Sequence, residues 1–195
     1  MDIKESLFEG KYVCLAPIDP EKDAEIESRW THDAEYLRLL DRAPARPLSP
    51  DRIKKRYEAI EKAVEDDGDL FYFTIRLRPD DRLIGFARIY WIVWTLGSGF
   101  LQLGIGDPEQ RGKGYASEAL SLLLRYAFCE LNLFSLIASV PEYNPAALSL
   151  FQKAGFVEEV RLRQALYRDG RRWDVVSMGL LREEYRIDPQ NLSDE

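Results

Sequence analysis

The spacing of apolar and polar residues predicts a strand and then two helices in the first third of the chain. Residues Tyr12–Ala16 alternate and end at a proline, which predicts a first strand. Apolar side chains recur at helical spacing through Pro20–Leu40, and we expect one helix there. A second helix is predicted from Ser49 and Asp51, which can cap its start, through Val64.

The middle of the chain predicts strands and then a helix. Leu70–Leu77 and Leu83–Trp94 are rich in β-formers and flank a Pro-Asp turn, and a Gly-rich turn leads to a third strand. This order predicts an antiparallel meander. An apolar stripe from Gly114 to Leu131 predicts an amphipathic helix. The apolar run Phe134–Val140 then suits a buried strand parallel to the third, since a helix of suitable length connects them in a β-α-β crossover.

A helix and a hairpin are predicted for the last third of the chain. Asn144–Ala154 has helical spacing and is followed by Gly155, which suits the left-handed residue past a helix end. Phe156–Tyr167 and Trp173–Leu181 are strand-like and flank an Asp-Gly turn, which predicts a C-terminal hairpin. The fold class expected from these elements is mixed α/β.

Composition limits the protein classes that remain. A length of 195 residues fits one domain over 1–195, with a core from about 8 to 185 and a loose tail at 186–195. The net charge of −7 argues against a sequence-independent grip on nucleic acid. No apolar run approaches the roughly 18 residues of a membrane span, and we expect a cytoplasmic protein. Cys14 and Cys129 lack metal-ligand spacing, so we expect buried free thiols and no metal.

The segment LGIGDPEQRGKGYASE at residues 103–118 places glycines and cations at a helix start. The first turn of a helix has unpaired N–H groups and the positive end of the dipole, so it attracts anions. Arg111 and Lys113 add charge, while Gly112 and Gly114 allow close approach and positive φ. The spacing fits neither a Walker A motif, which needs Ser or Thr after the lysine, nor the dinucleotide fingerprint. We therefore expect a pyrophosphate cradle.

Over roughly residues 8–185, the order of elements around this cradle resembles the GNAT superfamily of N-acetyltransferases. The Arg/Gln-x-x-Gly-x-Gly/Ala signature is matched by Arg111, Gly114 and Ala116, and a later motif by Asn144 and 153–156. The chain looks most like the branch of ribosomal-protein N-terminal and spermidine acetyltransferases. The residues that carry this likeness are Trp30, Asp33, Pro47 and Ser49. The resemblance implies a GNAT fold with splayed central strands and acetyl-coenzyme A (acetyl-CoA) as donor.

The resemblance also implies which residues bind the cofactor. The backbone of residues 111–116 would hold the pyrophosphate, and the strand 103–105 would pair with the pantetheine arm. Gly104 and Gly106 are compatible with a bulge that exposes the edge of this strand. The expected cofactor-binding residues are Leu103, Gly104, Ile105, Arg111, Gly112, Lys113, Gly114, Tyr115, Ala116, Asn144 and Phe151.

Catalytic groups follow from the same resemblance, with one departure. The backbone N–H near Ile105 would stabilise the oxyanion, and Asn144 would contact the pantetheine. Many family members place a tyrosine, as general acid for the leaving thiolate, at the position of Phe151, which has no proton to give. A thiol with a pKa near 8.5, about that of cysteine, leaves without much help. Other hydroxyls that could supply the proton are those of Tyr143, Ser149 and Tyr167.

No general base is evident, and this favours an acceptor amine of low pKa. At pH 7 an amine with a pKa near 10.4 is about 0.04% unprotonated, whereas an α-amine near 7.8 is about 14% unprotonated. The favoured acceptor is therefore the N-terminal α-amine of a protein or peptide. Alternatives are a small amine (a polyamine, an amino acid or an antibiotic-like amine) and a protein that binds CoA without turnover.

Four residues are candidates for contact with the acceptor. His32, the only histidine, and Asp33 lie in the region that borders the acceptor site in the resembling family, and a solvated helix start is the alternative role for His32. Trp91 belongs to an aromatic-rich hairpin, and Tyr167 precedes the last turn. Both aromatic residues also suit packing, or a homodimer contact.

Overall fold

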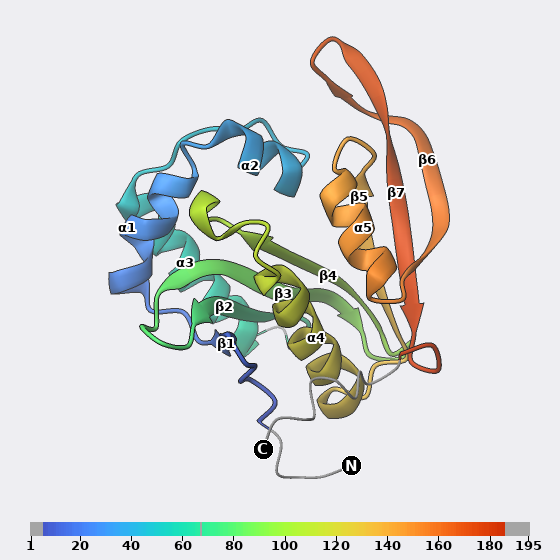
Figure 1. Cartoon of the computed structure of the whole chain (residues 1–195), viewed down its shortest axis with the longest axis horizontal. Coiled ribbons are helices and arrows are strands. Elements are labelled where there is room, and N and C mark those ends of the chain that lie inside the picture. The colour runs from blue at the N-terminus through green and yellow to red at the C-terminus, as the bar shows by residue number, and fades with distance from the viewer. Residues whose placement is uncertain (1–5, 67, 186–195) are drawn as a thin grey trace.

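The computed structural model describes residues 6–66 and 68–185, and its centre is a seven-stranded mixed sheet in the order β1-β2-β3-β4-β5-β7-β6 (Figure 1). The strands are β1 (Val13–Ala16), β2 (Phe71–Leu77), β3 (Leu83–Val93), β4 (Ser98–Ile105), β5 (Ser135–Pro141), β6 (Val157–Arg168) and β7 (Arg171–Leu181). The antiparallel meander and the hairpin predicted from the sequence are confirmed. The tail predicted at 186–195 lies outside the described residues.

Five α-helices in the described part of the chain cover the sheet. They are α1 (Pro20–Trp30), α2 (Ala34–Leu40), α3 (Pro50–Asp66), α4 (Tyr115–Arg125) and α5 (Pro145–Lys153). The main core lies between the sheet and the pair α4 and α5, where Leu101, Leu123 and Phe151 are buried together. The helices α1–α3 lie on the opposite face, where Tyr36 and Leu40 of α2 lie over Gly104 of β4. No helix among the described residues is long and apolar enough to cross a membrane.

The feature that positions the site is a fork between β4 and β5. The two strands run parallel, as the crossover predicted, but only Ser98–Phe100 pairs with Ser135–Ile137. Beyond these positions β5 continues its pairing with β7, and β4 continues with β3. The edge of β4 from Leu101 to Ile105 is therefore left without a strand partner. This is the splayed arrangement that the family resemblance implied.

The predicted helix Pro20–Leu40 is wrong as a single element, because the chain turns at residues 31–33. The hydroxyl of Thr31 donates to the carbonyl of Ser28 and accepts the N–H of Leu48, and Asp33 accepts the N–H of Tyr36 at 3.0 Å to cap a new helix. Hydroxyl and carboxylate side chains that bond to nearby backbone compete with helix continuation. Apolar periodicity alone did not reveal this competition.

Two smaller expectations also need correction. The helix predicted to run to Leu131 changes to a π-helical turn at Tyr126–Glu130. The register between β3 and β4 is regular from Tyr90 to Gly85, so the bulge expected from the two glycines is absent at Gly104. Just past β4, the N–H groups of Gly106 and Asp107 both donate to Ile84 O, at 2.8 and 3.2 Å. The lack of a side chain at the two glycines makes room for neighbouring side chains. A Cβ at Gly104 would lie 2.6 Å from Leu40, and one at Gly106 would lie 2.1 Å from the ring of Trp30.

The two cysteines are free, as expected, but half-buried rather than buried. Cys14 lies on β1, where partial burial raises the pKa of its thiol. Cys129 lies in the π-helical turn after α4. The described residues contain no group of His, Cys, Asp and Glu that could hold a metal ion.

Candidate active site

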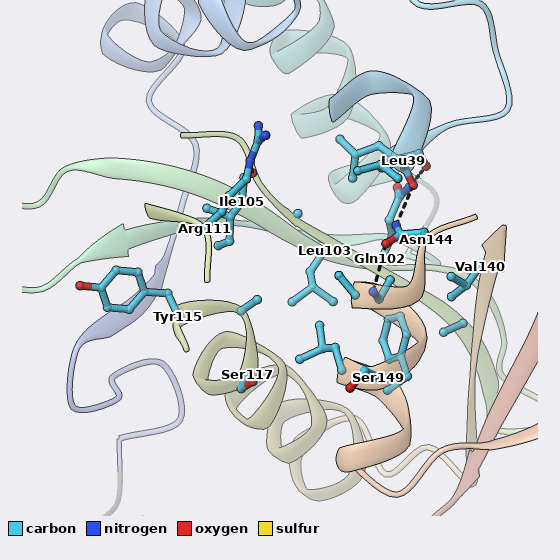
Figure 2. Close-up of a pocket in the computed structure, with 18 of the residues that line it drawn as sticks. Leu39, Gln102, Leu103, Ile105, Arg111, Tyr115, Ser117, Val140, Asn144 and Ser149 are labelled. Atoms are coloured by element: carbon cyan, nitrogen blue, oxygen red, sulfur yellow. Dashed lines mark hydrogen bonds between the residues drawn. The ribbon is translucent and has the colours of Figure 1, made fainter. Parts of the chain in front are cut away.

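A cavity of about 430 Å³ opens at the fork and is enclosed by β4, β5, α5, the start of α4 and the end of α2. Figure 2 shows Leu103 of β4, Ser117 of α4 and Ser149 of α5 around the same space. The predicted cofactor-binding residues that line it are Leu103, Gly104, Ile105, Arg111, Gly112, Gly114, Tyr115, Ala116, Asn144 and Phe151. Lys113 lines a neighbouring cavity instead, which shares Gly114 and Ser117 with the first.

The loop before α4 has the backbone conformation expected of an anion cradle. Gly112 and Gly114 have φ values of 75° and 89°, and a Cβ built on either would meet nothing within 4 Å. No side chain caps the first turn of α4, whereas Asp19, Asp33 and Asn144 cap α1, α2 and α5. Uncapped N–H groups beside clear space at the positive end of a helix fit a pyrophosphate.

The side chain of Arg111 holds the loop in place rather than facing the cradle. Its Nε donates to the carbonyl of Ile105 at 3.0 Å, and a terminal nitrogen donates to Gly106 O at 2.9 Å. The same guanidinium forms a 3.0 Å ion pair with Asp33, the cap of α2. Arg111 therefore contributes its backbone to the cradle, while its guanidinium links β4 to α2.

The free edge of β4 directs backbone N–H groups into the fork. The N–H of Gly106 donates to Ile84 O on β3 at 2.8 Å. Because alternate residues of a strand point their N–H groups in opposite directions, those of Ile105 and Leu103 point away from β3. Both residues line the cavity. This geometry fits the pairing with a pantetheine arm and the oxyanion contact that the resemblance implied.

The position of the missing tyrosine lies in the cavity wall. Phe151 is 5% exposed and packs against Phe156 with ring centroids 5.2 Å apart. Among the alternative hydroxyls, only Ser149 lines this cavity. The hydroxyl of Tyr143 donates to Arg38 O at 2.8 Å outside it, and Tyr167 is 65% exposed on β6.

The side chain of Asn144 is hydrogen-bonded within the protein. Its Oδ1 accepts the N–H of Ala147 at 3.0 Å and caps α5, and its Nδ2 donates to Leu39 O at 3.4 Å (Figure 2). Asn144 therefore joins α5 to the end of α2 at the cavity wall. Its contact with a pantetheine amide stays a prediction.

The structure separates the four acceptor candidates. Asp33 is joined to the cradle through Arg111, and the Tyr36 N–H and the arginine outweigh its burial and hold its pKa below the ordinary value. His32 is exposed in the turn between α1 and α2. Trp91 is 67% exposed on β3 with a φ of 52°, and neither it nor Tyr167 lines the cavity.

Sequence reasoning missed the residues that form the α2 end of the cavity. Tyr36, Leu39 and Leu40 of α2 line it, together with Gln102 and Ser139 from the two arms of the fork. Burial keeps Tyr36 a neutral phenol, because its pKa is raised far above the ordinary value. The apolar positions of 36–40 were visible in the sequence, but they suited a core as well as a cavity wall. The lining residues, all from the described chain, include no Asp, Glu or His.

Comparison with known proteins agrees with this geometry. Residues 13–157 match the acetyltransferase (GNAT) domain model. The chain is 34% identical over 78% of its length to the probable N-acetyltransferase YjcK of Bacillus subtilis, covering 84% of that protein. It is 36% identical over 53% of its length to spermidine N(1)-acetyltransferase of Vibrio cholerae, covering 59% of that protein.

A solved structure extends this likeness to the whole fold. The spermidine N-acetyltransferase from Vibrio cholerae, in complex with CoA and spermine, superposes with a TM-score of 0.77 at 26% identity. The likeness covers 89% of this chain and 97% of that one. With an uncapped helix start, an open strand edge and a domain match over most of its length, this chain belongs to the GNAT family of acetyl-CoA-dependent N-acetyltransferases.

Proposed function

We propose that the acceptor is the N-terminal α-amine of a protein or peptide. The observation that supports this is the absence of Asp, Glu and His among the described residues that line the cavity. Without a base in the wall, the acceptor amine must already be unprotonated when it enters from solution. At pH 7, deprotonation costs about 4.6 kcal/mol for an amine of pKa near 10.4, but only about 1 kcal/mol for an α-amine of pKa near 7.8.

The chain's own groups bind and orient the reactants. When bound, acetyl-CoA supplies the acetyl group as a thioester. The backbone of residues 111–116 holds the pyrophosphate, and the edge of β4 holds the pantetheine arm. The N–H of Ile105 would donate to the thioester carbonyl oxygen as it gains charge, and a donor placed in this way lowers a barrier by a few kcal/mol in other enzymes. Tyr36, Leu39 and Leu40 form the wall of the acceptor end.

A polyamine is the second candidate, because the relatives named above include spermidine acetyltransferases. A polyamine carries several positive charges, and its recognition is expected to use carboxylates. The cavity lining offers none within the described chain, and its charged side chains, Arg111 and Lys153, are both cations. The lining thus favours a singly charged amine over a polycation.

A thiol-release assay with three acceptors tests this proposal. The first is a peptide with a free α-amine and acetylated lysines, the second is the same peptide with a blocked α-amine and free lysines, and the third is spermidine. We expect the highest kcat/KM for the first. A higher kcat/KM for spermidine or for the lysine peptide would overturn the proposal, and a Gly114→Asp variant run in parallel reports turnover that does not need the cradle.

A further inference from the structure

Two arginines lie at the acceptor end of the fork, each bonded to a residue of the cavity wall. The Nε of Arg88, on β3, donates to Gln102 Oε1 at 3.0 Å. Arg42, just past α2, donates to Ser139 Oγ at 2.6 Å. Gln102 and Ser139 both line the cavity. The two guanidinium groups thus lie one hydrogen bond beyond the wall.

The two wall residues occupy equivalent places on the two arms of the fork. The last β4–β5 pair is Phe100 with Ile137, and Gln102 and Ser139 each lie two residues further on. Ser139 is exposed between two buried neighbours of β5, which point into the core beneath α5. Gln102 points to the α2 face, where its Nε2 donates to Leu40 O at 2.6 Å. One arginine therefore bonds to each arm of the fork near its mouth.

These arginines carry charge that the described residues do not neutralise by an ion pair. Arg38 and Arg111, by contrast, pair with Asp169 and Asp33 at 3.3 and 3.0 Å. Within residues 6–66 and 68–185, neither Arg42 nor Arg88 has a carboxylate within salt-bridge distance.

The groups around the two arginines leave their charges available. Arg88 lies over the ring of Tyr90 at 4.6 Å. Burial raises the pKa of Tyr90, while Arg88 and Arg42 both act to lower it, which places the two cations near one phenol. Asp41 is the acid that also acts on Tyr90, and its Oδ1 accepts the N–H of Ala43 at 3.1 Å.

We infer that Arg42 and Arg88 form an anion subsite that binds a carboxylate of the acceptor. This inference rests on the proposed function, because the acceptor must bring both an amine and an acid. Gln102 lies three residues from Ile105 along an extended strand, roughly 10 Å away. The carboxylate of a free amino acid lies within about 3 Å of its own amine, too close to span this distance. An extended peptide advances about 3.4 Å per residue, so an acidic second or third residue fits.

Amidated hexapeptides of alanine and glycine with one variable position test the subsite. The third residue is Glu, Gln or Lys, and amidation leaves the Glu side chain as the only carboxylate. For the wild-type protein we expect kcat/KM for the Glu peptide to exceed that for the Lys peptide by roughly tenfold or more, as for hydrogen bonds to charged groups. Arg42→Gln and Arg88→Gln should each remove most of this preference, and Arg42→Glu should reverse it.

Arg46→Gln is the matched control, since Arg46 is an exposed arginine of the same loop. It should keep the wild-type preference, and thermal midpoints verify that each variant folds. Equal kcat/KM for the three wild-type reactions would overturn the subsite while leaving α-amine acetylation intact. If no peptide reacts and spermidine does, the proposed function fails instead.

Discussion

The donor and acceptor halves of the cavity are built by different means. The donor half consists of backbone: two glycines with positive φ, an uncapped helix start and a strand edge, all within residues 103–116. The half where we propose that the acceptor binds consists of side chains from α2, β4 and β5. The donor half therefore depends on local backbone geometry, whereas the other half depends on side chains that come from elements far apart in the sequence.

One arginine holds much of the acceptor half together. Arg168, near the tip of β6, donates to Arg38 O at 2.6 Å and to the hydroxyl of Tyr143 at 2.7 Å. It also reaches the carbonyls of residues 41–43. These carbonyls lie at and beyond the C-terminal end of α2, where a cation is favourable. Figure 1 shows the hairpin rising beside α5 toward α2.

The comparison of the two halves predicts that the largest effect comes from disrupting the cradle. Gly114→Asp should lower CoA affinity by roughly 100-fold, because a φ of 89° strains any residue with a Cβ and the new carboxylate repels phosphate. Isothermal titration calorimetry with CoA measures this. Gly170→Asp is the control, since Gly170 has a φ of 77° in a hairpin turn away from the loop. If both variants bind CoA as the wild type does, the cradle assignment fails.

The next effect should be confined to the acceptor half. Arg168→Gln removes the charge that holds the end of α2, and we expect the KM for the acceptor amine to rise about tenfold. The Kd for CoA should stay unchanged, because the cradle shares no bond with Arg168. Steady-state kinetics and calorimetry measure the two values. Arg163→Gln, at an exposed position of the same strand, is the control, and an equal loss of CoA affinity would contradict the separation of the halves.

The difference between the halves also explains what could be predicted from the sequence. Sequence patterns predicted the positive φ of Gly112, Gly114 and Gly155, because a positive φ at the end or start of a helix is a local property. The role of Arg168 could not be predicted in this way, since its carbonyl partners at the end of α2 lie 125 to 130 residues earlier. The break before Asp33 was also missed, because it depends on a bond between Thr31 and Leu48 across a loop.

A smaller effect tests the ion pair that joins the halves. Asp33→Asn keeps a capping oxygen for α2 but loses the charge opposite Arg111, and an exposed ion pair is worth less than about 1 kcal/mol. Because the folded pKa of Asp33 is lowered, its contribution is present above the unfolded pKa of about 3.9 and is lost as pH falls through the folded value. Urea unfolding at pH 6 and pH 3 should therefore show a larger difference from wild type at pH 6 than at pH 3.

Asp33→Ala serves as the reference for this experiment. Alanine removes both the cap and the charge, so this variant should remain less stable than the Asn variant at both pH values, by about 1 kcal/mol. A difference between wild type and Asp33→Asn that persists unchanged at pH 3 would show that the carboxylate acts through packing rather than charge.

The smallest effect concerns the proton for the leaving thiolate. Phe151→Tyr returns a hydroxyl to the cavity wall, yet we expect kcat to change by about twofold or less, because a thiol with a pKa near 8.5 leaves without protonation. Phe156→Tyr is the control, since Phe156 packs against Phe151 but does not line the cavity. A tenfold rise in kcat for Phe151→Tyr alone would mean that thiolate protonation limits turnover. The donor half would then depend on a side chain as well as on its backbone.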